Sequence, residues 1–251
     1  MPSFPDAVAF GRALLASDDL DPVYTMLARV PRPQRRRVCF HYWCLYDMGL
    51  AATLGASPGW DGLRRVVASP GGARGAERRH FRGVAAQRAV AHYAERFATP
   101  EHAVAFLTEQ PSFVAVVGAA RTLPLFGPWI SFKVADMAVQ LFDVPLGAED
   151  SVFPLFYDEP RRGAALAAPG LGHDATTPLP VLSAALLAAL GEGAPNWAPS
   201  RALGLLEAET IFCKWKTHTT SRYHVGQDRA HLVHVLGRAE GPLVRALAAA
   251  L

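Results

Sequence analysis

The sequence predicts an all-α fold, and three observations support this prediction. Ala, Leu, Val and Arg recur at spacings of three and four residues, the period of an amphipathic helix. Alternating β-branched runs, which are typical of strands, are almost absent. The chain has 251 residues, 51% hydrophobic and 19% charged, a balance that favours a substantial core and excludes global disorder. We expect a single helical domain over residues 1–251, with residues 1–115 and 116–251 as candidate sub-lobes.

Breaking and capping residues mark where the first helices begin and end. Apolar residues interrupted by one glycine predict a short helix over residues 6–17. The longest periodic run covers residues 34–54. It begins after Pro31 and Pro33 and stops at Gly55, as expected from the conformational limits of proline and glycine.

Later segments follow the same logic. Residues 81–97 predict a helix, and Thr99 followed by Pro100 is the expected start of the next one, because Thr can cap a helix and Pro suits its first turn. Residues 147–180, rich in Gly, Pro and acidic residues, form the least regular part. Further helices are expected over 124–143, 178–190, 199–216 and 228–249.

Several functional classes are excluded by what the sequence lacks. No apolar run reaches the roughly 18 residues of a membrane span, and the N-terminus does not resemble a secretion signal, so we expect a soluble, cytoplasmic protein. The phosphate loop of nucleotide-hydrolysing kinases, the glycine-rich turn of nicotinamide enzymes and the zinc signature of deaminases are missing. The three cysteines predict neither a disulfide framework nor a zinc site. His231 and His234 have no identifiable third partner, so no metal site is predicted.

Charge is distributed unevenly along the chain. Residues 1–100 carry 14 Arg and 8 acidic residues, whereas residues 101–251 carry 11 basic and 14 acidic residues. An excess of arginine of this kind is typical of a surface for nucleic acid or phosphate. Of the 25 basic residues only Lys133, Lys214 and Lys216 are lysine, which suggests positions where a compact ammonium is needed.

A turn before the helix over residues 124–143 is a candidate phosphate site. In the stretch Leu123-Pro124-Leu125-Phe126-Gly127-Pro128, Gly127 precedes a helix start, whose free N–H groups attract anions. This stretch resembles the helix-hairpin-helix element of DNA glycosylases, although Leu125 stands where that pattern has its first glycine. In that superfamily a catalytic Asp follows the hairpin, and Asp150 lies near that place. The alternative is a tight helix corner with a solvated Asp150.

Two further segments are dense in charged groups. Arg78, Arg79, His80 and Arg82 predict an anion-binding cluster, with a solvated face as the alternative. Near the C-terminus, Glu207 and Lys214 lie seven residues apart on one helix face. The polar groups that follow suit proton transfer and phosphate binding, namely Lys216, His218, Arg222, Tyr223 and Asp228.

Aromatic residues give a third set of candidates. Tyr42 and Trp43 lie in the longest predicted helix, where aromatics serve either as core or as a platform for stacking bases. Trp129 and Trp215 are each embedded in a charged motif and are the stronger candidates for stacking.

Four blocks in the same order resemble one family. They are Asp21-Pro22-Val23-Tyr24 with His41-Tyr42-Trp43-Cys44-Leu45-Tyr46, then Glu77-Arg78-Arg79-His80-Phe81-Arg82-Gly83, then Phe126-Gly127-Pro128-Trp129 with Lys133 and Asp136, and finally Cys213-Lys214-Trp215-Lys216 with Arg222-Tyr223-His224-Val225-Gly226-Gln227-Asp228. Over residues 20–235 the chain is similar to the bacteriophage amino acid:DNA transferases, the α-glutamyl/putrescinyl-thymine pyrophosphorylases, which are grouped with helical DNA-glycosylase-like proteins.

The resemblance implies a late step in thymine hypermodification in the cytoplasm of an infected bacterium. The enzyme replaces the pyrophosphate on 5-hydroxymethyluracil in DNA with the amine of a free amino acid or polyamine. Leaving-group charge would meet preorganised cations, here Lys214, Lys216, Arg222 and the cluster of Arg78, Arg79 and Arg82. The amine would lose its proton to Asp150, Asp228, His218 or Glu207. No cofactor is predicted beyond a divalent metal such as Mg²⁺ accompanying pyrophosphate, and no oligomeric state is predicted.

The remaining roles concern the DNA. The target base leaves the stack, with Trp129, Trp215 or Tyr223 stacking on it and the Gly127 turn holding a neighbouring phosphate. We expect these segments to converge on one electropositive crevice. Two other readings remain open: a glycosylase-like enzyme using Asp150 with Lys133 as nucleophile, and a DNA-binding module without catalysis.

Overall fold

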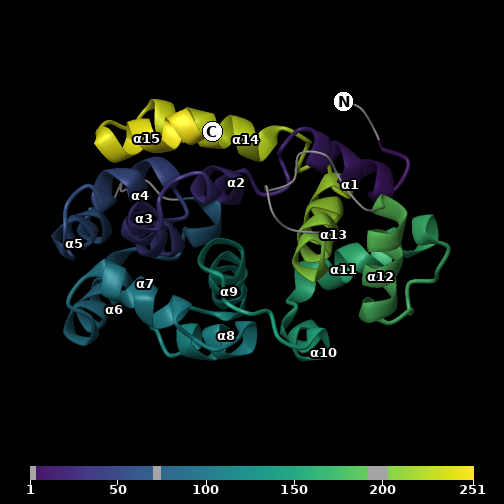
Figure 1. Ribbon diagram of the computed structural model, residues 1–251, viewed down its shortest axis with the longest axis horizontal. Coiled ribbons are helices and arrows are strands. Elements are labelled where there is room, and N and C mark those ends of the chain that lie inside the picture. Colours follow the sequence, from purple (N-terminus) through teal and green to yellow (C-terminus); the bar gives the residue numbers. More distant parts are fainter. Residues whose placement is uncertain (1–3, 70–74, 192–202) are drawn as a thin grey trace. The chain divides into compact units, whose positions relative to one another are not determined.

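The computed structural model describes residues 4–69, 75–191 and 203–251, and these residues form helices without any β-strand (Figure 1). The all-α prediction is therefore confirmed. The chain divides into two compact units, each made of two separate stretches. Unit 1 comprises residues 1–25 and 148–231, and unit 2 comprises residues 26–147 and 232–251. The sub-lobe boundary considered at residues 115 and 116 falls inside a helix of unit 2.

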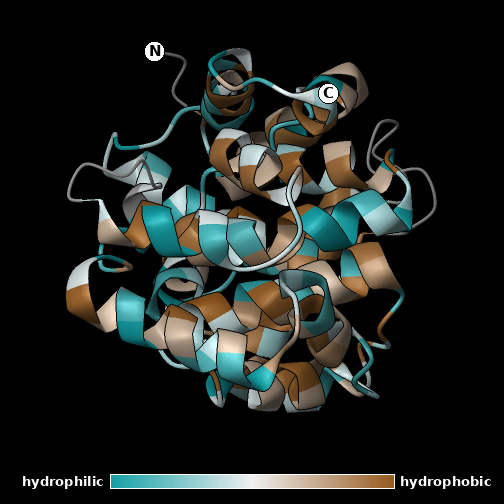
Figure 2. Ribbon diagram, turned by 90° about the vertical axis from the view of Figure 1, so that its left-hand side faces the viewer, coloured by the Kyte–Doolittle hydropathy of each residue, from teal (hydrophilic) through white to brown (hydrophobic). Residues whose placement is uncertain are grey.

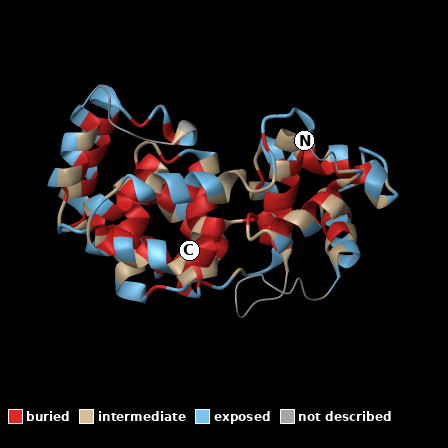
Figure 3. Cartoon of the chain, turned by 90° about the horizontal axis from the view of Figure 1, so that it is seen from above, coloured by how far each residue is buried: buried red, intermediate tan, exposed pale blue. Residues whose placement is uncertain are grey.

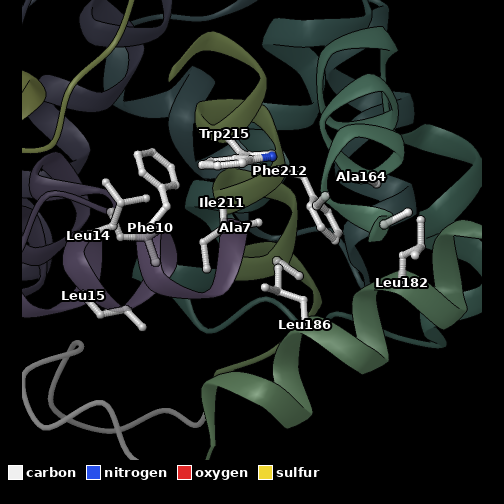
Figure 4. Packing of buried hydrophobic residues seen from close by; sticks show 14 of the residues in the cluster. Ala7, Phe10, Leu14, Leu15, Ala164, Leu182, Leu186, Ile211, Phe212 and Trp215 are labelled. Carbon is white, nitrogen blue, oxygen red and sulfur yellow. The ribbon is translucent and has the colours of Figure 1, made fainter. Parts of the chain in front are cut away.

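Unit 1 is organised around its longest helix, α13 (Leu205–Thr219), against which α1 (Ala7–Ala16), α11 (Asp158–Ala167) and α12 (Leu179–Leu190) pack. Figure 4 shows the resulting core, in which Phe10, Ile211 and Phe212 lie among leucine and alanine side chains. The helix α11 approaches closely because Gly163 has no side chain: a Cβ there would lie 1.8 Å from the Phe212 carbonyl oxygen. The remaining elements are α10 (Glu149–Val152), η2 (Phe153–Leu155) and η3 (Ala168–Leu171).

Unit 2 contains most of the other helices. Within it α3 packs on α4 and α7, α8 packs on α9, and α5 packs on α6. Their bounds are α3 (Arg32–Leu45), α4 (Met48–Gly55), α5 (Asp61–Ala68), η1 (Ala76–Arg78), α6 (Gly83–Arg96), α7 (Pro100–Thr108), α8 (Phe113–Arg121), α9 (Pro128–Phe142) and α15 (Pro242–Ala250). Two helices cross from one unit to the other along the chain, α2 (Pro22–Ala28) and α14 (Gln227–Gly237).

Aromatic side chains form part of the interior of unit 2. The ring of Phe40 makes edge-to-face contacts with Trp60 and Tyr93, each with centroids 5.3 Å apart, and stacks on Phe126 at 6.0 Å. Such pairs add to the stabilisation from burial. Figure 3 shows buried residues on the inner sides of most helices.

Figure 2 shows helices of mixed hydropathy. Among the described residues no helix is long and apolar enough to cross a bilayer.

Several predicted helix bounds are confirmed and others are wrong. Thr99 caps α7 as predicted, because its side chain accepts a hydrogen bond from His102 N. The long helix over 34–54 is in fact two helices, since Tyr46 adopts a left-handed conformation (φ 52°) and the Asp47 side chain caps α4. The last predicted helix is likewise broken, at Gly241 (φ 131°).

The stretch 147–180 is more regular than predicted. It contains the ten-residue helix α11, whose small residues Gly163, Ala164 and Ala167 are buried against its neighbours. The first residues of the helix expected over 199–216 lie outside the described part of the chain, and its observed part is α13.

Candidate active site

Lys214 lies at the centre of a polar network in unit 1. Its Nζ donates hydrogen bonds to the Asp19 carbonyl oxygen at 2.5 Å and to the Tyr223 hydroxyl at 3.1 Å, and it forms an ion pair with Asp228 at 2.6 Å. Only 12% of the Lys214 side chain is exposed. A buried ammonium needs such partners, because desolvation of an unpaired charge is costly.

The Asp19 carboxylate is the other centre of this network, and it is fully buried. It accepts hydrogen bonds from the Tyr223 hydroxyl, from Gly226 N at 2.7 Å and from Arg229 N at 2.7 Å. Burial, followed by the charge of Asp228 and the hydrogen bond to Asp19, raises the pKa of the Tyr223 hydroxyl, which therefore stays protonated.

Two other predicted cations lie at the end of α13 and in the turn after it. Lys216 Nζ lies 4.0 Å from a Glu159 carboxylate oxygen, beyond hydrogen-bond distance. Arg222 is exposed in the turn after α13, and its backbone N donates to the Thr217 carbonyl oxygen at 3.1 Å. Lys214, Lys216 and Arg222 thus lie near one another in sequence at the end of α13, but Lys214 and Lys216 point to different sides of the helix, toward Asp19 and toward Glu159 respectively.

His218 lies in the same part of unit 1. Its Nδ1 is 3.0 Å from the Tyr223 carbonyl oxygen, and its ring stacks on Phe10 and Trp215. Because a carbonyl oxygen only accepts hydrogen bonds, this contact assigns the proton to Nδ1 in the neutral ring. Nε2 is then the atom that can accept a proton.

Two predicted carboxylates have different surroundings. Glu207 is buried, and its side chain accepts a hydrogen bond from Gly204 N at 2.8 Å, so it caps the N-terminus of α13. Asp150 is exposed in the first turn of α10, where the helix dipole stabilises a negative charge. Each residue therefore has a structural task, and its role as a base stays a prediction.

In unit 2 the predicted arginine cluster is split between the interior and the surface. Arg78 is fully buried; it donates to the Cys44 carbonyl oxygen at 3.1 Å and the Leu125 carbonyl oxygen at 3.0 Å. Its guanidinium also lies over the rings of Phe81 and Phe126, 4.9 and 5.4 Å from their centroids. Direct contact of Arg78 with DNA would require this side chain to leave the interior.

The other members of the cluster, Arg79, His80 and Arg82, are exposed. His80 Nε2 lies 3.3 Å from Arg78 Nη1, and partial burial together with the charges of Arg78 and Arg79 lowers the pKa of His80. The anion-binding role of these three residues stays a prediction, and it rests on Arg79 and Arg82 as the permanent charges.

The predicted phosphate-binding turn joins α8 to α9, which pack against each other. Leu125 has φ 63°, the left-handed conformation that favours glycine. Arg78 and the Tyr93 hydroxyl hold the turn by donating to the carbonyl oxygens of Leu125 and Pro124. Gly127 caps α9 and is exposed. The helix-hairpin-helix element and phosphate binding at Gly127 both stay predictions.

The third lysine belongs to a different environment. Lys133 is buried in α9 and pairs with Asp136 one turn away, at 3.4 Å. It lies in unit 2, whereas Lys214 and Lys216 lie in unit 1. One electropositive crevice that includes all three lysines therefore stays a prediction.

The aromatic candidates differ mainly in exposure. Tyr42, Trp43, Trp215 and Tyr223 are buried, and Trp43 donates from Nε1 to Met137 Sδ. Trp129 is half-buried beside Tyr46, with ring centroids 5.0 Å apart. In this conformation Trp129 is the aromatic candidate with surface available for a base.

The sequence reasoning missed Asp18 and Asp19, which Arg229 joins to the start of α14. Arg229 Nη1 pairs with Asp18 at 2.9 Å, while Arg229 N binds Asp19. The available signal was a pair of adjacent acidic residues just after the first helix, which local patterns do not connect to residue 229.

The amino-acid sequence is similar to those of known phage transferases. Residues 52–223 match the family described as amino acid:DNA transferase. The chain is 32% identical over 253 residues to a glycinyltransferase of Pseudomonas phage PaMx11, an alignment that covers 87% of this chain and 86% of that protein. It is 25% identical over 246 residues to a putrescinyltransferase of Delftia phage PhiW-14, covering 92% of this chain and 78% of that protein.

Proposed function

This chain belongs to the amino acid:DNA transferase family, and from that premise we propose that it acts on pyrophosphorylated 5-hydroxymethyluracil in DNA. The amine of an amino acid or polyamine bonds to the 5-methylene carbon, and the carbon–oxygen bond to pyrophosphate breaks. The bonding electrons leave with pyrophosphate, and the ammonium formed on the nucleophile gives up its proton. The product is a hypermodified thymine.

The observation that carries this proposal is the position of three cations at one end of α13, with Lys214 and Lys216 in its last turns and Arg222 in the turn that follows. Pyrophosphate gains negative charge as it leaves, so cations that are already in place stabilise the transition state more than the ground state. The two lysines differ in their partners. Lys214 Nζ contacts Asp19, Tyr223 and Asp228. Lys216 Nζ lies 4.0 Å from a Glu159 carboxylate oxygen, which is too far for a hydrogen bond. Lys216 and Arg222 are therefore assigned to the leaving group, and Lys214 to holding the site.

The proton acceptor in this proposal is His218. Its Nδ1 faces the Tyr223 carbonyl oxygen, which leaves Nε2 as the basic atom. Of the other predicted bases, Asp228 pairs with Lys214 and Glu207 caps α13. His218 and Lys214 both contact Tyr223, His218 at its carbonyl oxygen and Lys214 at its hydroxyl, so the proton acceptor is part of the network that holds the site.

The DNA contacts are assigned to unit 2. Arg79 and Arg82 are exposed cations for phosphates, and Gly127 offers the free N-terminus of α9. Trp129, half-buried, is assigned to stacking on a DNA base.

The nucleophile is tested directly with the whole chain. DNA carrying pyrophosphorylated 5-hydroxymethyluracil is incubated with all amino acids and putrescine, digested to nucleosides and weighed by mass spectrometry. Glycine is the first expectation, because the relative named glycinyltransferase is more similar to this chain than the relative named putrescinyltransferase. A new nucleoside mass supports the proposal and identifies the nucleophile.

Other products of that assay would contradict the proposal. Abasic sites would indicate cleavage of the glycosidic bond, and DNA bound without any chemical change would indicate a binding module. An unchanged nucleoside profile with every nucleophile refutes the pyrophosphorylated base as the substrate.

Lys216→Ala tests the leaving-group assignment. We expect turnover to fall by at least about 100-fold while DNA affinity stays within about tenfold, since the contact strengthens in the transition state. Arg162→Ala is the matched control, because Arg162 is an exposed cation of unit 1 whose pairing is with Asp158. Equal turnover in both variants would remove the role given to Lys216.

A further inference from the structure

Asp19 lies at a sharp corner of unit 1, between α1 and α2. Asp19 N donates to the Leu14 carbonyl oxygen at 2.9 Å, and the preceding residue, Asp18, has φ 55°. The corner turns the Asp19 side chain into the interior, where it has no exposed surface. A carboxylate that is fully removed from water must have strong hydrogen-bond donors around it.

The donors come from a segment about 200 residues later. One carboxylate oxygen accepts from the Tyr223 hydroxyl and from Gly226 N, and the other accepts from Arg229 N. Gly226 and Arg229 lie at the start of α14, where backbone N–H groups have no acceptor within the helix. Asp19 therefore caps α14 from a distant part of the chain.

The backbone of Asp19 holds the other side of the same turn. Its carbonyl oxygen accepts from Lys214 Nζ, and Lys214 belongs to α13, the helix before the turn. The single residue Asp19 thus binds the helix before the turn, the tyrosine within it and the first amides after it.

This arrangement decides what the turn presents to solvent. Tyr223 is buried against Asp19, while its neighbours Arg222 and His224 are exposed. Ser221 (φ 56°) and Gly226 (φ 92°) bend the chain on either side. The buried Tyr223 lies between the exposed Arg222 and His224. Holding Tyr223 in place therefore also holds the backbone from which these two side chains extend toward solvent.

We propose that Asp19 is a positioning residue of the transferase, which holds the turn over residues 220–226 so that Arg222 meets the departing pyrophosphate. This inference rests on the proposed function. It adds a residue that does not touch the substrate and acts through Tyr223, Gly226 and Arg229.

Asp19→Asn is the test, because the amide has nearly the same shape but only one accepting oxygen. Its NH₂ group faces at least one N–H donor, so the three hydrogen bonds cannot all persist. We expect kcat to fall about tenfold or more, with KM for the amino acid and Kd for DNA within about threefold, because a leaving-group contact acts mainly in the transition state. Hydrogen exchange at the amides of Gly226 and Arg229 is expected to accelerate at least about tenfold.

Asp18→Asn is the matched control. Asp18 is the neighbouring carboxylate and binds Thr25 Oγ1 and Arg229 Nη1, but it has no contact with the turn among the described hydrogen bonds. Asn readily adopts the left-handed conformation found at this position. We expect its kcat and the exchange rate of the Gly226 amide to stay within about threefold of the unmodified chain.

The outcomes separate this inference from the proposed function. Unchanged kcat or unchanged amide protection in Asp19→Asn overturns the positioning role. Failure of the unmodified chain to act on pyrophosphorylated DNA refutes the proposed function, while the exchange rates still decide whether Asp19 holds the turn. If Asp19→Asn does not fold, Tyr223→Phe removes one of the three donors. A loss of kcat of about threefold with faster exchange at Gly226 then supports the role, and no change in either overturns it.

Discussion

Replacement of His41 by leucine is expected to make the folding of unit 2 less sensitive to acid. His41 lies in α3 with 1% of its surface exposed, and its Nδ1 has no hydrogen-bond partner among the described residues. Burial lowers the pKa of His41 from 6.5 to about 4. Between these two values the unfolded chain binds a proton that the folded chain does not, so stability falls as the pH drops from about 6.5 toward 4.

The magnitude follows from the two pKa values. Relative to pH 7, the folded state should lose about 2 kcal/mol at pH 5 and about 3 kcal/mol at pH 4 through His41 alone. His41→Leu removes this contribution, so the free energy of unfolding of the variant should rise relative to that of the unmodified chain as the pH falls.

The assay is urea unfolding at pH 7, 6 and 5, followed by tryptophan fluorescence, which reports mainly on unit 2 through Trp43, Trp60 and Trp129. His102→Leu serves as the control, because His102 is exposed in α7 of the same unit. The reasoning is refuted if the His41→Leu variant and the unmodified chain lose stability in parallel between pH 7 and pH 5.

Two other pairs of variants test the packing and the division of the arginine cluster. Gly163→Ala should destabilise unit 1 by more than about 3 kcal/mol, because its Cβ would meet the Phe212 carbonyl oxygen at 1.8 Å. Gly118→Ala, in a helix with open space around the new atom, should stabilise by about 0.5 kcal/mol, and thermal unfolding measures both. Arg78→Ala should cost about 3 kcal/mol of stability, since it removes the hydrogen bonds to the Cys44 and Leu125 carbonyl oxygens. It should leave the salt dependence of DNA binding unchanged, because the Arg78 side chain is buried. Arg79→Ala should do the reverse, lowering the slope of log affinity against log salt by about one; equal slopes in both variants would contradict the division.

Periodicity and capping residues predict much of the helical structure, because both act within a few residues. The prediction for Thr99 and Pro100 succeeds for this reason. It fails at Tyr46, whose left-handed conformation ends α3 just before Asp47 caps α4. Asp47 is a local signal for a new helix start, but the left-handed conformation of Tyr46 is not, since a tyrosine adopts it only when its surroundings stabilise it.

The candidate site shows the same limit with respect to charge. A run of arginines looks uniform in sequence, yet Arg78 is buried while Arg79 and Arg82 are exposed. The buried position of Arg78 depends on carbonyl groups at Cys44 and Leu125, which come from other helices and turns. Burial is a property of the packed unit, and residue type alone does not specify it.

The sequence alone predicts the helical class, the uneven charge and the chemical groups near the end of α13, because each depends on residues that are neighbours in the chain. It does not predict the partners of those groups. Asp19 reaches Tyr223, Gly226 and Arg229 across more than 200 residues of chain. That meeting exists only because α1, α11 and α12 pack around α13 and bring distant backbone segments within hydrogen-bond distance.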